Sequence, residues 1–385
     1  MVLYKESFRI KGKECMHKKI VILLLISSHL SGKEKYPQEG ICCVPVADIT
    51  IEPLSQYYPN IPYTKWPSLI SFCPQDISSD TFLRISQLLL NDKVLVLEEK
   101  GNEYRIQALA QSYANRLFTH NRIFWAAKHT IFITNHKQAE KIYTIRPLFI
   151  QELGCTVSAG TELELLQTSN TKYRCRSLHP TSKQNVSFLL DTKHCCIPYQ
   201  DKRKQRTAFV QLIRYWAQQE PKKIPYVLGG SSVVETAISD DFLLQREGYV
   251  RPSVSSPHAG LDCAHLIFLA ARMSGVPIKS TNTLGLAKTL QPFKENDTLE
   301  SGDILLWKGH VVVITDPDKG LLAEARGYGS GYGVVQEIPF KETFKEIQES
   351  NDLIDAYLHK KSLTRLDKNG KKEQTITSLS LYKLP

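Results

Sequence analysis

The sequence predicts an α+β fold in which one mixed domain follows two small all-β modules. Three observations predict it. Residues 266–273 form an apolar run that begins after Asp262 and ends at Gly275, which is typical of a buried helix. The apolar stretches 310–315 and 321–325 flank a turn and favour a hairpin. Most of the preceding chain shows strand–turn–strand patterns, and a length of 385 residues accommodates two or three domains.

Residues 1–32 are predicted to be an N-terminal extension and signal peptide. Met16-His17-Lys18-Lys19 is a positive segment, 20–26 is an unbroken apolar run, and 27–32 offers small residues for cleavage. The run is shorter than the about 20 residues that span a bilayer. We therefore expect secretion across the inner membrane into the periplasm or cell envelope, with no stable membrane span. An unusual cytosolic N-terminus is the alternative, and Met16 is a second candidate start.

The two all-β modules are predicted over residues 40–135 and 140–200. In the first, 44–50 is a strand, and 87–97 leads through a glycine-containing turn at 98–102 into 103–109. In the second, 159–166 turns at 168–170 into 172–176. Each segment alternates apolar and polar residues on both sides of its turn. Both modules are therefore predicted to be built on hairpins.

The mixed domain is predicted over residues 201–349. It opens with an amphipathic helix at 201–219, whose Phe209, Leu212, Ile213 and Trp216 fall at helical spacing and are expected in the core. Glycines at 327, 329, 331 and 333 precede a strand at 334–338 and not a helix, so we interpret them as a hairpin beside the site rather than a phosphate loop. The C-terminal tail, 350–385, is expected either to pack loosely or to close the sheet.

Three residues of this domain form a candidate catalytic set. Cys263 opens the predicted helix, where the helix dipole is expected to lower the pKa of its thiol. His310 begins one strand and Glu324 lies on the next, and pairing across the turn at 316–320 brings positions 310 and 324 together. A thiol, an imidazole base and a carboxylate that orients the imidazole make up a triad for nucleophilic catalysis. Alone, each has a plainer interpretation, as a core thiol, a surface histidine or a solvated carboxylate; His265 is interpreted as structural.

The same segments carry a resemblance to a known family. The order of cysteine and histidine is papain-like, and residues 205–345 resemble the NlpC family of cell-wall cysteine peptidases. The resemblance rests on four motifs: Ile224 to Ser232, Leu261-Asp262-Cys263, Ser301 to Leu306, and Gly309-His310-Val311-Val312. The hairpins before them resemble bacterial SH3-like domains, so the resemblance implies two small SH3-like barrels before a papain-like peptidase domain.

The resemblance also implies roles and a substrate. Cys263 and His310 would be catalytic, Tyr226 would lie in the active site near the nucleophile, and Asp262 would help to bind the amino end of the substrate. The substrate would be a stem peptide of peptidoglycan, cut between D-glutamate and a diamino acid. The chain departs from the family at Ala264 and His265, where serine and glycine are common, at Glu324, where histidine is common, and in a long insertion over 231–261.

Composition and cysteine content set further expectations. With a net charge of +10, an envelope protein is expected to be attracted to anionic wall polymers or membrane surfaces. Nucleic acid is the competing partner, but no nucleic-acid reader motif is present. No zinc-binding spacing occurs, so we expect no cofactor and no metal. Of the nine cysteines, Cys155 and Cys175 are candidates for a disulfide, with buried free thiols as the alternative. A catalytically weak wall-binding adaptor and an amidase or acyltransferase on the same scaffold are the alternative functions.

Overall fold

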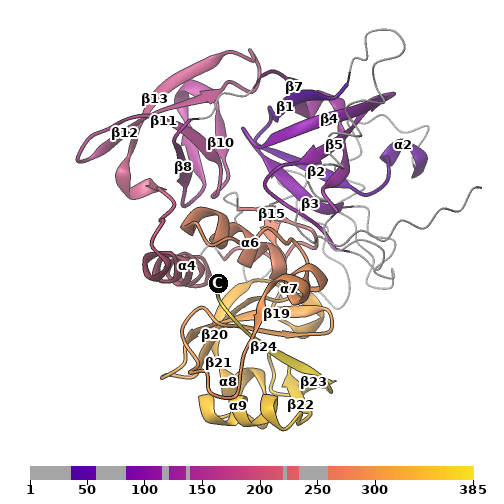
Figure 1. The fold of residues 1–385 in the computed structure, drawn as a ribbon, viewed down its shortest axis with the longest axis vertical. Coiled ribbons are helices and arrows are strands. Elements are labelled where there is room, and N and C mark those ends of the chain that lie inside the picture. The colour runs from indigo at the N-terminus through magenta and orange to yellow at the C-terminus, as the bar shows by residue number, and fades with distance from the viewer. Residues whose placement is uncertain (1–35, 58–83, 115–120, 136–138, 220–222, 234–258) are drawn as a thin grey trace, which may run out of the picture. The chain divides into compact units, whose positions relative to one another are not determined.

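The computed structural model describes residues 36–57, 84–114, 121–135, 139–219, 223–233 and 259–385. The chain divides into two compact units, Met1–Pro37 and Gln38–Pro385. Of the first unit, only Tyr36 and Pro37 are described, so the predicted signal peptide lies outside the described residues. The second unit contains every helix and strand discussed below (Figure 1).

The first part of this unit is a seven-stranded sheet of order β3-β2-β6-β5-β4-β1-β7. All of its pairs are antiparallel. Asn91 in the left-handed conformation (φ 70°) and the Asp92 carboxylate, which accepts from the Leu89 N–H at 2.9 Å, turn the chain between β3 and β4. The hairpin predicted about the turn at 98–102 is confirmed as the pair β4–β5, and the turn at Asn91 divides the segment 87–97 between β3 and β4. The elements are β1 (Gln38–Cys42), β2 (Val46–Thr50), α2 (Leu54–Tyr57), β3 (Arg84–Leu89), β4 (Lys93–Lys100), β5 (Glu103–Ala108), β6 (Ile123–Ala127), η2 (Lys128–Thr130) and β7 (Ile131–Ile133).

A second antiparallel sheet follows, with five strands in the order β13-β12-β11-β8-β14. The predicted hairpin at 159–176 is confirmed as the pair β11–β12. Neither this sheet nor the first closes on itself among the described strands, so the SH3-like barrels are not confirmed. The elements are β8 (Lys141–Thr144), β9 (Leu148–Ile150), η3 (Gln151–Leu153), β10 (Cys155–Val157), β11 (Glu162–Thr168), β12 (Lys172–Leu178), β13 (Asn185–Asp191), η4 (Thr192–His194) and β14 (Cys195–Cys196).

The last part of the chain is built around a six-stranded sheet of order β17-β24-β18-β19-β20-β21. Two helices lead into it, α4 (Lys202–Ala217) and α6 (Cys263–Ser274), and a short ladder joins β15 (Ser231–Ser232) to β16 (Gly260–Leu261). The other elements are α7 (Thr283–Thr289), β17 (Gln291–Pro292), β18 (Ile304–Trp307), β19 (His310–Asp316), β20 (Leu321–Ala325), η5 (Tyr328–Ser330), β21 (Val335–Pro339), α8 (Phe340–Thr343), α9 (Ser350–Leu358), β22 (Leu363–Leu366), β23 (Lys372–Ile376) and β24 (Leu379–Lys383).

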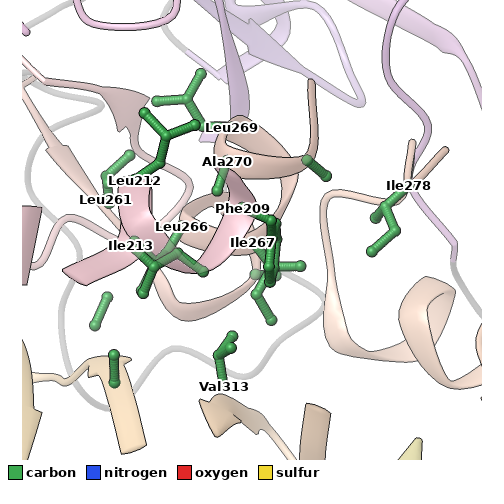
Figure 2. Close-up of a cluster of buried hydrophobic side chains, with 14 of the residues drawn as sticks. Phe209, Leu212, Ile213, Leu261, Leu266, Ile267, Leu269, Ala270, Ile278 and Val313 are labelled. Carbon is green, nitrogen blue, oxygen red and sulfur yellow. The ribbon is translucent and has the colours of Figure 1, made fainter. Parts of the chain in front are cut away.

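Helices α4 and α6 pack on one face of this sheet. Their apolar side chains form one buried cluster with Val311 and Val313 of β19 and Ala323 of β20. Figure 2 shows Phe209, Leu212 and Ile213 of α4 lying against Leu266, Ile267 and Ala270 of α6. Helix α6 ends at Gly275 in the left-handed conformation (φ 89°), as predicted. The core assignment of Phe209, Leu212, Ile213 and Trp216 is likewise confirmed.

The opposite face of the same sheet is covered by the C-terminal segment. Val312 and Ile314 of β19 and Leu322 of β20 join a second buried cluster with Phe340, Phe344, Leu353 and Leu363. Strand β24 pairs with β18, so residues 350–385 close the sheet, which is one of the two predicted outcomes. Because side chains alternate along a strand, His310 starts on the face of Val312, the face that this segment covers.

A buried ion pair connects helix α6 to both N-terminal sheets. The Arg272 guanidinium contacts Asp92 and lies 3.5 Å from Glu162, and its centre lies 5.2 Å from the Tyr143 ring centroid. Asp92 belongs to the turn after β3, and Glu162 begins β11. One arginine on the helix that starts at Cys263 therefore holds a residue from each sheet.

The described cysteines are all free thiols. They include Cys155 and Cys175, which do not form the disulfide considered above, whereas Cys15 and Cys73 lie outside the described residues. No helix among the described residues is long and apolar enough to cross a membrane.

We predict that Arg272→Met lowers the free energy of unfolding by about 3 kcal/mol or more, because it leaves the buried Asp92 carboxylate without its cation and Glu162 with Lys141 alone. Arg105→Met is the matched control, since Arg105 pairs with Glu98 at the surface, where side-chain exposures are 44% and 48%. That pair contributes about 1 kcal/mol or less. Urea denaturation followed by circular dichroism measures both. Equal losses in the two variants would contradict the importance of the buried pair.

Candidate active site

His310 and Glu324 meet as the sequence predicted. His310 opens β19 after a turn at Lys308-Gly309, and it pairs with Trp307 of β18. Its Nε2 lies 2.7 Å from Glu324 Oε2, and both residues are buried. The hairpin β19–β20 brings the two positions together through its antiparallel register.

Cys263 is the first residue of α6. The Asp262 side chain caps this helix by accepting from the backbone N–H groups of Ala264 and His265 at 3.0 and 2.8 Å. The Cys263 thiol receives hydrogen bonds from the backbone N–H groups of Val311 and Ala264. It therefore lies against the start of β19, next to His310.

The thiol has a raised pKa, which is opposite to the effect predicted from the helix dipole. Burial and the Asp262 carboxylate raise the pKa of Cys263 to about 12. The two backbone N–H groups and the more distant Arg365 lower it, but they do not compensate for the burial. The prediction of a lowered pKa was wrong because the sequence does not reveal that Cys263 is buried.

The imidazole is held neutral in this structure. Burial and the adjacent Arg365 guanidinium lower the pKa of His310, and together they outweigh the Glu324 carboxylate. Burial raises the pKa of Glu324, but Arg365, His310 and Arg326 lower it to about 2. Glu324 is therefore ionised at every physiological pH. The resting site contains a thiol, a neutral imidazole and a carboxylate, and no hydrogen bond joins the described thiol and imidazole.

Tyr226 and Asp262 are both connected to the residues that directly precede the nucleophile. The Tyr226 segment bridges Leu261, and the Leu261 N–H donates to the Pro225 carbonyl at 3.0 Å. A Cβ on Gly260 would stand 2.6 Å from that same carbonyl oxygen, so glycine permits this close approach. Tyr226 is half-buried beside Gly327. Asp262 is buried, and its second oxygen accepts from the Gly229 N–H at 3.0 Å. Both oxygens of Asp262 are thus already engaged with backbone.

Sequence reasoning missed four residues that surround the His310–Glu324 pair. Arg365 Nη2 lies 2.5 Å from Glu324 Oε2 and 3.1 Å from His310 Nε2. Arg326 Nη1 reaches the other oxygen of Glu324 at 3.4 Å, and Glu373 pairs with both arginines. Trp307 lies against the imidazole, with ring centroids 5.0 Å apart. Arg326 sits two residues after Glu324, which was a usable signal, whereas Arg365 and Glu373 belong to the predicted tail.

The first sheet contacts the segments beside Cys263. Gln87 Oε1 accepts from the Ser231 N–H and the Ser232 hydroxyl, both at 2.9 Å. His265 is buried and lies 2.8 Å from the Ser86 hydroxyl, which agrees with its structural interpretation. The base of the predicted insertion is the β15–β16 ladder, and residues 234–258 lie outside the described residues. Strand β3 therefore contacts both β15, at the base of the insertion, and α6, the helix that begins at Cys263.

Comparison with solved structures shows which known fold this architecture resembles. A structure of an NlpC/P60 family protein from Bacillus cereus matches with a TM-score of 0.52 and 16% identity, over 78% of this chain and 94% of that one. This chain shares its fold. NlpC2 from Trichomonas vaginalis (TM-score 0.32, 11% identity, 80% and 94% covered) and the peptidoglycan hydrolase RipB from Mycobacterium tuberculosis (TM-score 0.27, 17% identity, 48% and 68% covered) are too dissimilar to inform this chain. No family model matches, and no curated protein matches.

The NlpC/P60-like fold agrees with the α+β class and with the resemblance read from the motifs. Among the described residues, no group of three or more His, Cys, Asp or Glu side chains is arranged to hold a metal ion.

We predict that alkylation of Cys263 accelerates about tenfold for each pH unit between pH 6 and 9, because the thiolate is the reactive form and its fraction rises in that way below the pKa. Cys196 is an internal control, since burial also raises its pKa to about 12. Iodoacetamide labelling followed by peptide mass spectrometry measures both rates. A rate at Cys263 that stays constant across neutral pH would show a preformed thiolate–imidazolium pair instead.

Proposed function

We propose that this protein is an exported cysteine peptidase that hydrolyses the stem peptides of peptidoglycan. The observation that carries the proposal is the buried His310–Glu324 contact at 2.7 Å beside Cys263, the first residue of a helix. A buried carboxylate on an imidazole next to a thiol is the arrangement that nucleophilic catalysis requires. The NlpC/P60-like fold supports the substrate class, because its members include cell-wall hydrolases by the resemblance stated above.

In the proposed mechanism, His310 takes the proton of the Cys263 thiol through Nδ1 while Cys263 Sγ attacks the scissile carbonyl. Glu324 stabilises the imidazolium through the Nε2–H bond. The imidazolium then protonates the leaving amine, and the C–N bond breaks to give a thioester. Water, deprotonated by His310, hydrolyses the thioester and regenerates the thiol. Hydrogen bonds of catalytic groups often tighten only when substrate binds, which is consistent with a resting site that lacks the thiol–imidazole bond.

Two residues are assigned to the substrate in this proposal. Tyr226 lines the oxyanion side, because its segment is bridged to Leu261 just before the nucleophile. Asp262 supplies negative charge near the amino end of the peptide, although its oxygens already accept from three backbone N–H groups. The bond between D-glutamate and a diamino acid is the cleavage site we propose, and the periplasm or cell envelope is the proposed location.

A catalytically weak wall-binding adaptor is the second candidate, and one observation favours it. The raised pKa of Cys263 leaves very little thiolate at neutral pH before substrate arrives. An amidase or acyltransferase on the same scaffold would use the same triad on a different bond. The products formed from peptidoglycan distinguish the peptidase, the wall-binding adaptor and the amidase or acyltransferase.

We predict that the protein releases peptide fragments from purified peptidoglycan and that Cys263→Ala lowers this rate by about 10³-fold or more, because the nucleophile is lost. Cys196→Ala is the matched control, since Cys196 lies in the second sheet and its thiol contacts the Met273 carbonyl. Mass spectrometry of digested sacculi and of defined muropeptides identifies the bond cut. Full turnover by folded Cys263→Ala protein would overturn the cysteine mechanism, and free sugar chains without peptide cleavage would identify an amidase.

We predict that Glu324→Gln lowers kcat on the order of 10⁴-fold with a much smaller change in KM, because a neutral amide no longer fixes the imidazole tautomer or stabilises the imidazolium. Glu337→Gln is the matched control. Glu337 lies on the next strand, paired with Arg214 at 3.0 Å, and it does not contact His310. Steady-state kinetics on one defined muropeptide measures both variants. Wild-type kcat in Glu324→Gln would mean that another group orients His310.

A further inference from the structure

Arg365 stands between the C-terminal hairpin and the His310–Glu324 pair. It lies on β22, its side chain is 5% exposed, and its Nη2 is within hydrogen-bond distance of both partners. The guanidinium also covers Trp307, with 4.9 Å from its central carbon to the ring centroid, and Trp307 in turn lies against the imidazole. Arg365 is therefore fixed by aromatic packing as well as by charge.

The two contacts at His310 Nε2 show where the imidazole carries its hydrogen. Glu324 is ionised and can only accept, so a contact of 2.7 Å to its Oε2 requires that Nε2 carry the hydrogen. A protonated Nε2 has no lone pair, so Arg365 Nη2 cannot donate to it at 3.1 Å and donates to Glu324 instead. The lone pair then remains on Nδ1, the nitrogen that a general base needs.

Arg326 provides the natural comparison. It also donates to Glu324, but to the other oxygen and at 3.4 Å, and it has no contact with His310. Its guanidinium packs over Tyr332 at 4.6 Å. Both arginines hold the carboxylate and share Glu373. Both guanidinium charges lower the pKa of His310, but of the two only Arg365 lies within hydrogen-bond distance of the imidazole.

We propose that Arg365 is a positioning residue of the active site, which fixes the Nε2–H tautomer of His310 through Glu324 and disfavours a resting imidazolium. The C-terminal hairpin β22–β23, predicted as part of a tail, would thereby be a component of the catalytic apparatus. This inference rests on the proposed function for its kinetic consequence, but its structural claim concerns His310 alone.

The charges around His310 determine whether its pKa rises or falls when the Arg365 charge is removed. Glu324 faces it from β20, Arg326 follows β20, Arg365 and Glu373 come from the hairpin, and Cys263 comes from α6. Arg365 lowers the pKa of His310, and Glu324 opposes that effect. Removal of the Arg365 charge leaves the Glu324 carboxylate less compensated. The pKa of His310 must then rise, and the acid limb of kcat/KM must move to higher pH.

The decisive experiment is an NMR titration of the full chain labelled with ¹⁵N-histidine, with His310 assigned by loss of its signals in His310→Ala. In the wild-type protein we expect a protonated Nε2 and a His310 pKa below its ordinary value. In Arg365→Met we expect that pKa to rise by roughly one unit, the size of effect that a neighbouring charge produces. In Arg326→Met, which removes the same group from the other oxygen of Glu324, we expect less than half of that rise.

Arg365→Lys is the second variant. It keeps the charge but lacks the planar guanidinium that contacts Glu324 while it packs over Trp307, so we expect the His310 pKa to stay near that of wild type while kcat falls about tenfold. An unchanged His310 pKa in folded Arg365→Met, or equal shifts in the Met variants of Arg365 and Arg326, would overturn the inference. If Arg365→Met does not fold, wild-type kcat in Arg365→Lys would overturn it instead.

The two proposals fail separately. A wild-type protein that cuts no peptide would refute the proposed function, yet the titration would still decide the role of Arg365. Conversely, active wild-type protein and inactive Cys263→Ala with an unmoved His310 pKa would refute only the role of Arg365.

Discussion

The site depends on one buried carboxylate. Glu324 has no solvent exposure, so an ionised side chain there has to be compensated by groups within the protein. Arg365, Arg326 and the His310 N–H provide that compensation, together with the amide of Gln336 at 3.3 Å. Glu373 balances the second guanidinium charge, which leaves a cluster of two cations and two anions. Because these charges compensate one another, the imidazole is held by Glu324 in one orientation, and the C-terminal hairpin is attached to the catalytic sheet.

Local sequence signals were sufficient for the parts of the site that lie close together in the chain. Asp262 before an apolar run and Gly275 after it predicted α6, and the structure has both caps. The turn at 316–320 predicted the pairing of two strands, and their register brings His310 to Glu324 across only 14 positions. These predictions succeeded because helix caps and tight turns are properties of a few neighbouring residues.

Long-range contacts were not predictable in the same way. Arg365 is separated from Glu324 by 41 positions and from His310 by 55, and the sequence around it is polar enough to be interpreted as a tail. The predicted lowering of the Cys263 thiol pKa was wrong for a related reason. A helix N-terminus is visible in sequence, whereas the burial that outweighs it depends on how β19 and α6 pack. The turn at Asn91 was missed because apolar residues of strand-like character lie on both sides of the short polar segment 91–93.

The candidate catalytic residues lie on opposite faces of the six-stranded sheet. Cys263 belongs to the cluster formed by α4, α6, Val311 and Val313, whereas His310, Glu324 and Trp307 lie on the face covered by the C-terminal segment. The two halves meet only at the first residues of β19, where the Val311 N–H binds the thiol and His310 is the adjacent residue. Gly309, in the β18–β19 turn, has a positive φ of 82° and no atom within 4 Å of an added Cβ, whereas the next residue, His310, is packed against Trp307 and held by Glu324.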